Sequence, residues 1–260
     1  MADREVKVKI LGDSSGARKA FNEVDQGGTK LGSALSRLGG VLAATFAIDK
    51  VRDFVRGSNE EAREAQKVTA QTEQVIRSTG GAAKVSADQV ADYAGKLSGL
   101  AGIDDEVIQS GQNLILTFTN IKNGVGKGND IFDQATKAAL DMSVAFGQDM
   151  SSSAIQLGKA LNDPIKGITA LSRVGVSFTE QQKEQIKTMV QAGDVAGAQK
   201  VILAELNRQV GGSAEAQATA ADRLRVTIGN LKESFGTVLL PFVDRFANAL
   251  ADVLPRAFDA

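Results

Sequence analysis

The chain has 260 residues, of which 43% are hydrophobic and 23% are charged, so it can bury the core of one sizeable domain or two small ones and is not expected to be disordered. Its net charge is −1 and 5% of its residues are aromatic, which argues against specific nucleic-acid binding, because such binding needs a basic surface. The sequence contains no Cys and no His. These absences exclude disulfides, cysteine nucleophiles, histidine-based triads and most zinc or iron sites.

The N-terminal region, residues 1–80, is predicted to hold a short β-strand followed by extended helices. Valine and isoleucine alternate with lysine over residues 5–11, and this period of two is typical of a strand. Four leucines within residues 31–42, spaced four, three and four apart, then form a short apolar seam. A longer helical pattern covers residues 41–78, and the Thr-Gly-Gly of residues 79–81 is expected to end it.

The middle of the chain, residues 81–212, is predicted to be a compact domain of helical hairpins. Ser86 and Thr179 are each followed three positions later by Gln, which is the signature of a capping box at a helix start. The glycine-rich residues 123–130 are predicted to be a flexible surface loop. Further helix starts are predicted at Asp104, Ile131, Ser151, Pro164 and Asp194.

The C-terminal region, residues 213–260, is predicted to be one long amphipathic helix that resembles a coiled coil. Its apolar residues are spaced four, three, four, three and four apart, which places them on one face. They are Leu224, Ile228, Leu231, Phe235, Val238 and Phe242. We expect this seam to be an interface, either between copies of the chain or against the chain's own domain. Pro241 lies inside the seam and should kink the helix.

Two features of the sequence are similar to catalytic or nucleotide-binding sites but do not meet the requirements of such sites. Residues 114–128 resemble a phosphate-binding loop, but Ile121 stands where the loop needs glycine, and Gly128 stands where it needs Ser or Thr. The acidic residues 60–64 and 104–106 fit a polar helix face and a helix start better than a catalytic carboxylate pair. We therefore predict that the chain is not an enzyme and has no catalytic, cofactor-binding or metal-binding residues.

Residues 155–216 carry a series of short motifs in a fixed order. They are Leu157-Gly158-Lys159-Ala160-Leu161, Asp163-Pro164, Leu171, Gly175-Val176-Ser177-Phe178-Thr179 and Gly212-Ser213-Ala214. In order and spacing this segment resembles the recurring core segment of phage and prophage tail tape measure proteins. Residues 5–20 fit the opening of such proteins more loosely, with a Lys- and Val-rich strand before a Gly-Asp turn. Because members of that family are usually much longer, we expect the chain to correspond to the N-terminal region.

The resemblance implies a structural protein of the virion that sets tail length and templates assembly of the tail tube. It implies that several copies associate as a homo-oligomer in the host cytoplasm, with tail assembly chaperones, the tail tube protein and baseplate or tail-tip proteins as partners. The protein would lie in the tail lumen and leave it ahead of the DNA during genome ejection. Membrane contact would arise only at that stage, and no specific nucleic acid would be bound.

Other functions remain open from the residues alone. A membrane-active helical protein could bury the apolar residues 41–48 or 238–246, although the apolar runs in these segments are far shorter than the ~20 residues that span a bilayer. A generic helical scaffold or adaptor would need no more than the predicted helices. A cell-wall hydrolase is disfavoured by the absence of His, Cys and a convincing pair of acids. The charged N-terminus also lacks the apolar core of a secretion signal.

Overall fold

The computed structural model describes the backbone of residues 48–258 and the side chains of residues 54–238, Leu240 and Pro241. Within this part of the chain, every regular element is an α-helix, which confirms the mainly α fold class. The predicted N-terminal strand and the leucine seam that follows it lie outside the described residues.

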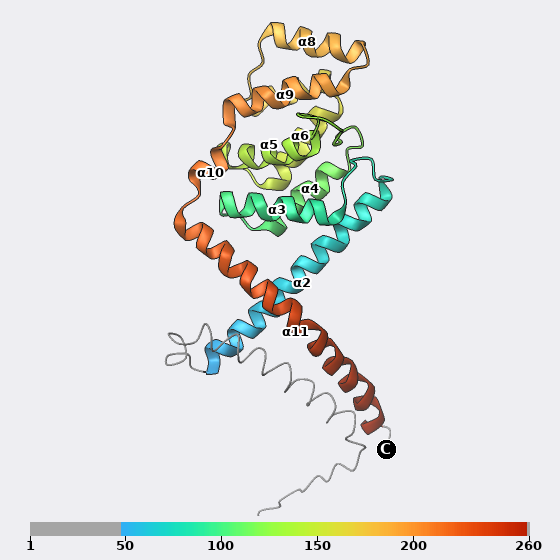
Figure 1. Ribbon diagram of the computed structural model, residues 1–260, viewed down its shortest axis with the longest axis vertical. Coiled ribbons are helices and arrows are strands. Elements are labelled where there is room, and N and C mark those ends of the chain that lie inside the picture. The colour runs from blue at the N-terminus through green and yellow to red at the C-terminus, as the bar shows by residue number, and fades with distance from the viewer. Residues whose placement is uncertain (1–47, 259–260) are drawn as a thin grey trace, which may run out of the picture. The chain divides into compact units, whose positions relative to one another are not determined.

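Ten helices cover most of the described chain (Figure 1). They are α2 (Ile48–Ser78), α3 (Ala87–Ala101), α4 (Asp105–Leu116), α5 (Ile131–Ala145), α6 (Met150–Asn162), α7 (Pro164–Arg173), α8 (Glu180–Gln191), α9 (Val195–Val210), α10 (Ser213–Gln217) and α11 (Ala220–Phe258). Residues 57–238 form one compact unit. This unit holds α3 to α10 and the adjoining parts of α2 and α11, and the contacts described below belong to it.

Side-chain caps set the starts of most helices. The capping boxes at Ser86 and Thr179 are confirmed: each hydroxyl accepts from the backbone N–H three residues on, and the glutamine there accepts from the cap's own backbone N–H. Asp104 and Asp194 cap α4 and α9, as predicted. Pro164 is the first residue of α7, where its missing N–H costs nothing. Hydrogen bonds between residues close in sequence therefore determine where the helices of the middle region begin.

Two predicted boundaries are wrong. The helix expected to start at Ser151 is α6, and its cap is Asp149, whose Oδ1 accepts from the backbone N–H of Ser152 at 2.7 Å. The region after Gly212 is not one helix but the short α10 followed by α11. A new capping pair separates them, because Thr219 Oγ1 accepts from the Asp222 N–H at 3.1 Å. α11 then continues through Pro241 to Phe258, so the proline does not end the helix.

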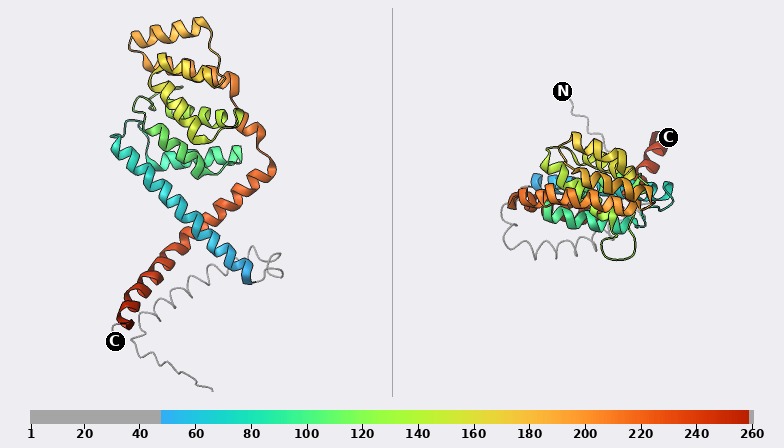
Figure 2. Two further views of the ribbon diagram at one scale, coloured as in Figure 1. Left: turned by 180° about the vertical axis from the view of Figure 1, so that it is seen from behind. Right: turned by 90° about the horizontal axis from the view of Figure 1, so that it is seen from above.

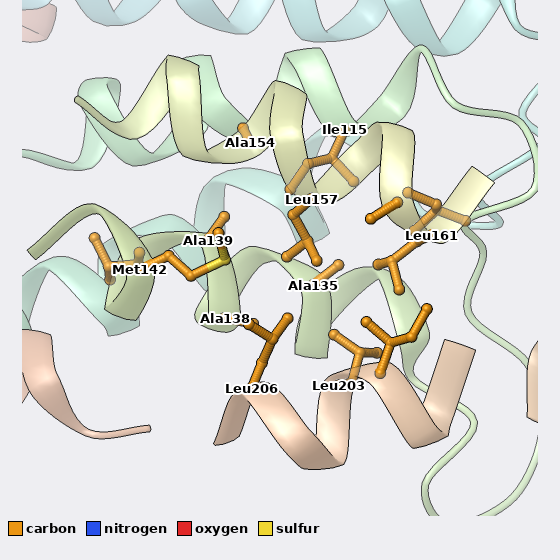
Figure 3. Packing of buried hydrophobic residues seen from close by; sticks show 14 of the residues in the cluster. Ile115, Ala135, Ala138, Ala139, Met142, Ala154, Leu157, Leu161, Leu203 and Leu206 are labelled. Carbon is orange, nitrogen blue, oxygen red and sulfur yellow. The ribbon is translucent and has the colours of Figure 1, made fainter. Parts of the chain in front are cut away.

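The compact unit is a stack of helices with α5 near its centre. Figure 1 shows the α3–α4 hairpin on one side of α5 and α6, and α9 followed by α8 on the other, and the reverse view in Figure 2 shows the same order. α6 packs against α4, α5 and α7, while α10 lies against α5 and α3. Side chains from four helices meet in the core (Figure 3). They include Ile115, Ala135, Ala139, Met142, Leu157, Leu161, Leu203 and Leu206.

Small residues let several elements approach closely. A Cβ on Gly167 of α7 would lie 2.5 Å from the carbonyl oxygen of Ala160 on α6, and one on Gly158 would overlap the ring of Phe118. On α11, a Cβ on Gly236 would lie 2.7 Å from the Cβ of Ala62, so α2 and α11 touch there. Glycine is required at these positions by space rather than by backbone conformation, because each lies within a helix.

Buried polar side chains tie distant parts of the unit together. Gln199 of α9 is almost fully buried, and its Nε2 donates to the backbone oxygens of Asn120 at 3.0 Å and Leu161 at 2.9 Å. Asp141 of α5 is also buried, and its Oδ1 accepts from the Ala214 N–H of α10 at 3.1 Å. A buried polar group is costly unless it is hydrogen-bonded, so these bonds favour one arrangement of the helices.

Candidate functional site: an apolar stripe on α11

The first part of α11 is attached to the rest of the compact unit at two places. At its start, Arg223 Nε donates to the backbone oxygen of Leu100 at 3.2 Å, and a Cβ on Gly102 would lie 2.7 Å from the Cβ of Asp222. Further along, Gly236 meets α2 at Ser58 and Ala62. These two contacts fix which face of α11 is turned toward the unit.

The predicted seam residues lie mainly on the opposite face and are open to solvent. Leu224 is 59% exposed, Ile228 and Leu231 are 44% exposed, and Val238 is 61% exposed. Phe235 is half-buried, and the side chain of Phe242 lies outside the described residues. We call the five residues from Leu224 to Val238 the α11 stripe; they are Leu224, Ile228, Leu231, Phe235 and Val238.

Helix geometry explains why the stripe is separate from the attached face. At 100° per residue, the five side chains fall within an arc of about 80°. Val226, the buried hydrophobic residue of this segment, is rotated by about 160° from the middle of that arc. α11 thus has one face that packs on its own unit and an opposite apolar face whose residues, apart from the half-buried Phe235, are largely exposed.

The stripe is large enough to support weak association. Full burial of an aliphatic side chain is worth about 1.5–3 kcal/mol, and the four exposed members are already about half covered, so burying the rest gives roughly 3–6 kcal/mol per chain. Two chains would contribute about twice that, against an association cost of about 4–15 kcal/mol. The stripe alone therefore favours weak, concentration-dependent contacts.

The acidic residues after α3 form the closest group of potential metal ligands in the described part of the chain. Asp104, Asp105 and Glu106 each place a carboxylate oxygen within 4.8 Å of the others. Burial, a hydrogen bond with Asp104 and the charge of Asp105 raise the pKa of Glu106 to about 9. Asp104 already serves α4 as its cap, since its Oδ1 accepts from the Glu106 N–H at 3.2 Å. The cluster has the chemistry of a helix start, as the sequence predicts.

The loop that imitates a phosphate site has another architecture. It follows helix α4 rather than a strand, and it is closed by a bridge between Asn123 and Asp130. The Gly124 N–H donates to the Asn129 oxygen at 2.7 Å, so this amide is already used inside the loop. Asn129 also accepts from Lys200 of α9 at 2.5 Å, which ties the loop to the helical stack. These contacts give the loop a defined shape.

Comparisons with protein-family models, with curated proteins and with solved structures find no match for this chain. Among the described residues, no helix is both long enough and apolar enough to cross a membrane.

The motifs of residues 155–216 have clear structural roles. Leu157, Leu161 and Leu171 are fully buried in the core. Gly175 has a φ of +106°, a left-handed conformation that glycine adopts at little cost. Thr179 is the cap of α8. The residues that carry the resemblance therefore specify packing and turns.

Proposed function

We propose that this chain is the N-terminal region of a phage or prophage tail tape measure protein, a structural protein that sets tail length and is not an enzyme. The proposal is carried by the motifs of residues 155–216, whose order and spacing resemble the core segment of that family. The all-helical unit fits this role, because a ruler needs helices with a fixed rise per residue.

The α11 stripe supplies the assembly surface that such a protein needs. Its apolar residues repeat at heptad spacing, and all but the half-buried Phe235 are exposed, as expected for a helix that associates with other copies of the chain. In this role the chain acts in the tail lumen after assembly in the host cytoplasm. Tail assembly chaperones, the tail tube protein and baseplate or tail-tip proteins are the proposed partners.

Self-association through the stripe can be tested by sedimentation of the purified chain over a wide concentration range. We expect the wild-type chain to associate at high concentration, and Leu231→Asp to prevent it, because a carboxylate cannot be buried in an apolar interface without a large penalty. Asn230→Asp is the matched control: it adds the same charge one position away, on an exposed part of α11 outside the stripe. Equal sedimentation of the two variants, or a wild-type chain that stays monomeric throughout, would contradict assembly through the stripe.

The ruler itself is tested by changing the length of the encoded protein in its phage or prophage. Two extra tandem copies of residues 237–257 of α11, 42 residues in all, should lengthen the tail by about 63 Å at ~1.5 Å per residue, as seen by electron microscopy of negatively stained tails. A tail of unchanged length would refute the proposed function. Leakage of liposomes caused by the purified chain would instead favour the membrane-active alternative.

A further inference from the structure

A cavity of about 220 Å³ lies beside α5 and α9 and is bounded by Tyr93 of α3. Its apolar wall is made of Ala138, Leu203, Leu206 and Val210, which are all buried in the core. Figure 3 shows Ala138 of α5 close to Leu206 of α9, with Leu203 further along the same helix. The polar part of the lining includes Asp130, Lys137, Asp141 and Asn207. The cavity therefore combines an apolar wall with charged groups.

The positive charge in this lining is already paired. Lys137 Nζ lies 2.8 Å from Oδ2 of Asp141, whose side chain is almost fully buried. The second oxygen of Asp141 accepts from the Ala214 N–H. Lys137 and Asp141 thus neutralise each other, and neither is free to recognise a ligand ion.

Asp130 is the remaining charge of the lining, and it is exposed. It precedes α5, but its side chain does not cap that helix; its Oδ1 instead accepts from Gln134 Nε2 at 2.9 Å. A carboxylate has lone pairs for several hydrogen bonds, so Asp130 can accept further donors. After the Lys137–Asp141 pair is counted, the lining keeps one net negative charge.

Tyr93 is the aromatic residue of the lining. Burial, together with the charges of Asp133, Asp130 and Asp141, raises the pKa of Tyr93 to about 12. Two of these carboxylates, Asp130 and Asp141, also line the cavity, so a further negative charge would be unfavourable there. The aromatic ring of Tyr93 also attracts cations to its face.

We propose that this cavity binds a basic side chain, lysine or arginine, presented by a partner protein. The aliphatic stem would lie against the apolar wall, and the charged end would meet the Asp130 carboxylate and the Tyr93 ring. A hydrated metal ion would leave the apolar wall unused, a neutral ligand would leave the net charge unpaired, and an anion would add to the net negative charge of the lining. Binding here is independent of assembly through the α11 stripe, since no stripe residue lines the cavity.

The sequence offers a direct readout, because Tyr93 is the single tyrosine of the chain and there is no tryptophan. The intrinsic tyrosine fluorescence of the full chain therefore comes from Tyr93, which lines this cavity. The probe is n-butylammonium, with n-butanol as the neutral analogue and butyrate as the anionic one. We expect a saturable change with n-butylammonium at millimolar concentration, and at least about threefold weaker effects with the two analogues. Nα-acetyl-lysine amide should bind as the ammonium does, because it presents the same group as a side chain.

Two variants distinguish binding in the cavity from a general effect of the protein's charge. Asp130→Asn should weaken binding of n-butylammonium by about threefold to tenfold, because the amide keeps the oxygen that accepts from Gln134 but loses the charge. Glu184→Gln on α8 is the matched control: it removes the same charge from an exposed site that does not line the cavity. The proposal is overturned if butanol or butyrate binds as well as the ammonium, if both variants weaken binding equally, or if no probe changes the Tyr93 signal. If n-butylammonium binds but Nα-acetyl-lysine amide does not, the proposal that the ligand is a side chain of a partner protein would be overturned.

Discussion

Gly167→Ala tests the close approach of α6 and α7, which lies inside the motif segment. The added Cβ would lie 2.5 Å from the carbonyl oxygen of Ala160 and 2.7 Å from its carbonyl carbon. Both are backbone atoms, so no side-chain rotation can relieve the overlap. Overpacking of this kind costs about 2–3 kcal/mol, the upper part of the usual range. Alanine also favours a helix over glycine by about 1 kcal/mol. The expected net loss of unfolding free energy is therefore about 1–2 kcal/mol.

The matched control is Gly95→Ala in the interior of α3, where nothing lies within 4 Å of the new Cβ. The same chemical change should there raise stability by about 0.5–1 kcal/mol. In thermal unfolding followed by circular dichroism, Gly167→Ala should lower Tm by about 2–8 °C, and Gly95→Ala should raise it by about 1–4 °C. If the two variants shift Tm in the same direction, the proposed contact between α6 and α7 is wrong.

Three further predictions concern titratable groups. Hydrogen bonding with Arg208 lowers the pKa of the buried Glu205 to about 2, so its stabilising effect is complete above about pH 4.5 and disappears as pH falls toward 2; Glu205→Gln should remove this pH dependence of urea unfolding. Burial and the charges of Asp105, Asp104 and Glu61 raise the pKa of Glu233, so stability falls as pH rises above the ordinary glutamate value. Glu233→Gln should therefore raise Tm at pH 7 but not at pH 4, and an equal gain at both values would contradict this reasoning. Tyr93 should ionise near pH 12 in an absorbance titration of the folded chain, and an ordinary midpoint near 10 would show that its environment is wrong.

Local sequence signals predicted much of the middle region. The caps at Ser86, Asp104, Thr179 and Asp194 act within three residues of each helix start, so they can be read from short stretches of sequence. The same logic explains an error: Asp149 and Ser151 are both good caps, and spacing alone does not decide between them.

Long-range features could not be predicted in this way. The bonds from Gln199 to Asn120 and Leu161 join positions 79 and 38 residues apart, and no local pattern marks them. The seam of α11 was visible from its spacing, but spacing gives only which residues share a face. Its exposure depends on how Arg223 and Gly236 attach the helix to other elements. The cavity at Tyr93 was missed for the same reason, because its lining comes from three separate helices and an adjoining turn.

The two attachments of α11, at Arg223 and at Gly236, also limit the insertions that the helix can tolerate between them. Between Arg223 and Gly236 the helix bridges two fixed points about 20 Å apart at ~1.5 Å per residue. One inserted residue there would rotate the stripe by about 100° relative to one attachment, and seven would move Gly236 about 10 Å away from Ser58. Changes of length between Arg223 and Gly236 are therefore expected to be tolerated poorly, because even a whole heptad, which turns the stripe by only about 20°, separates one of the two attachments from its partner.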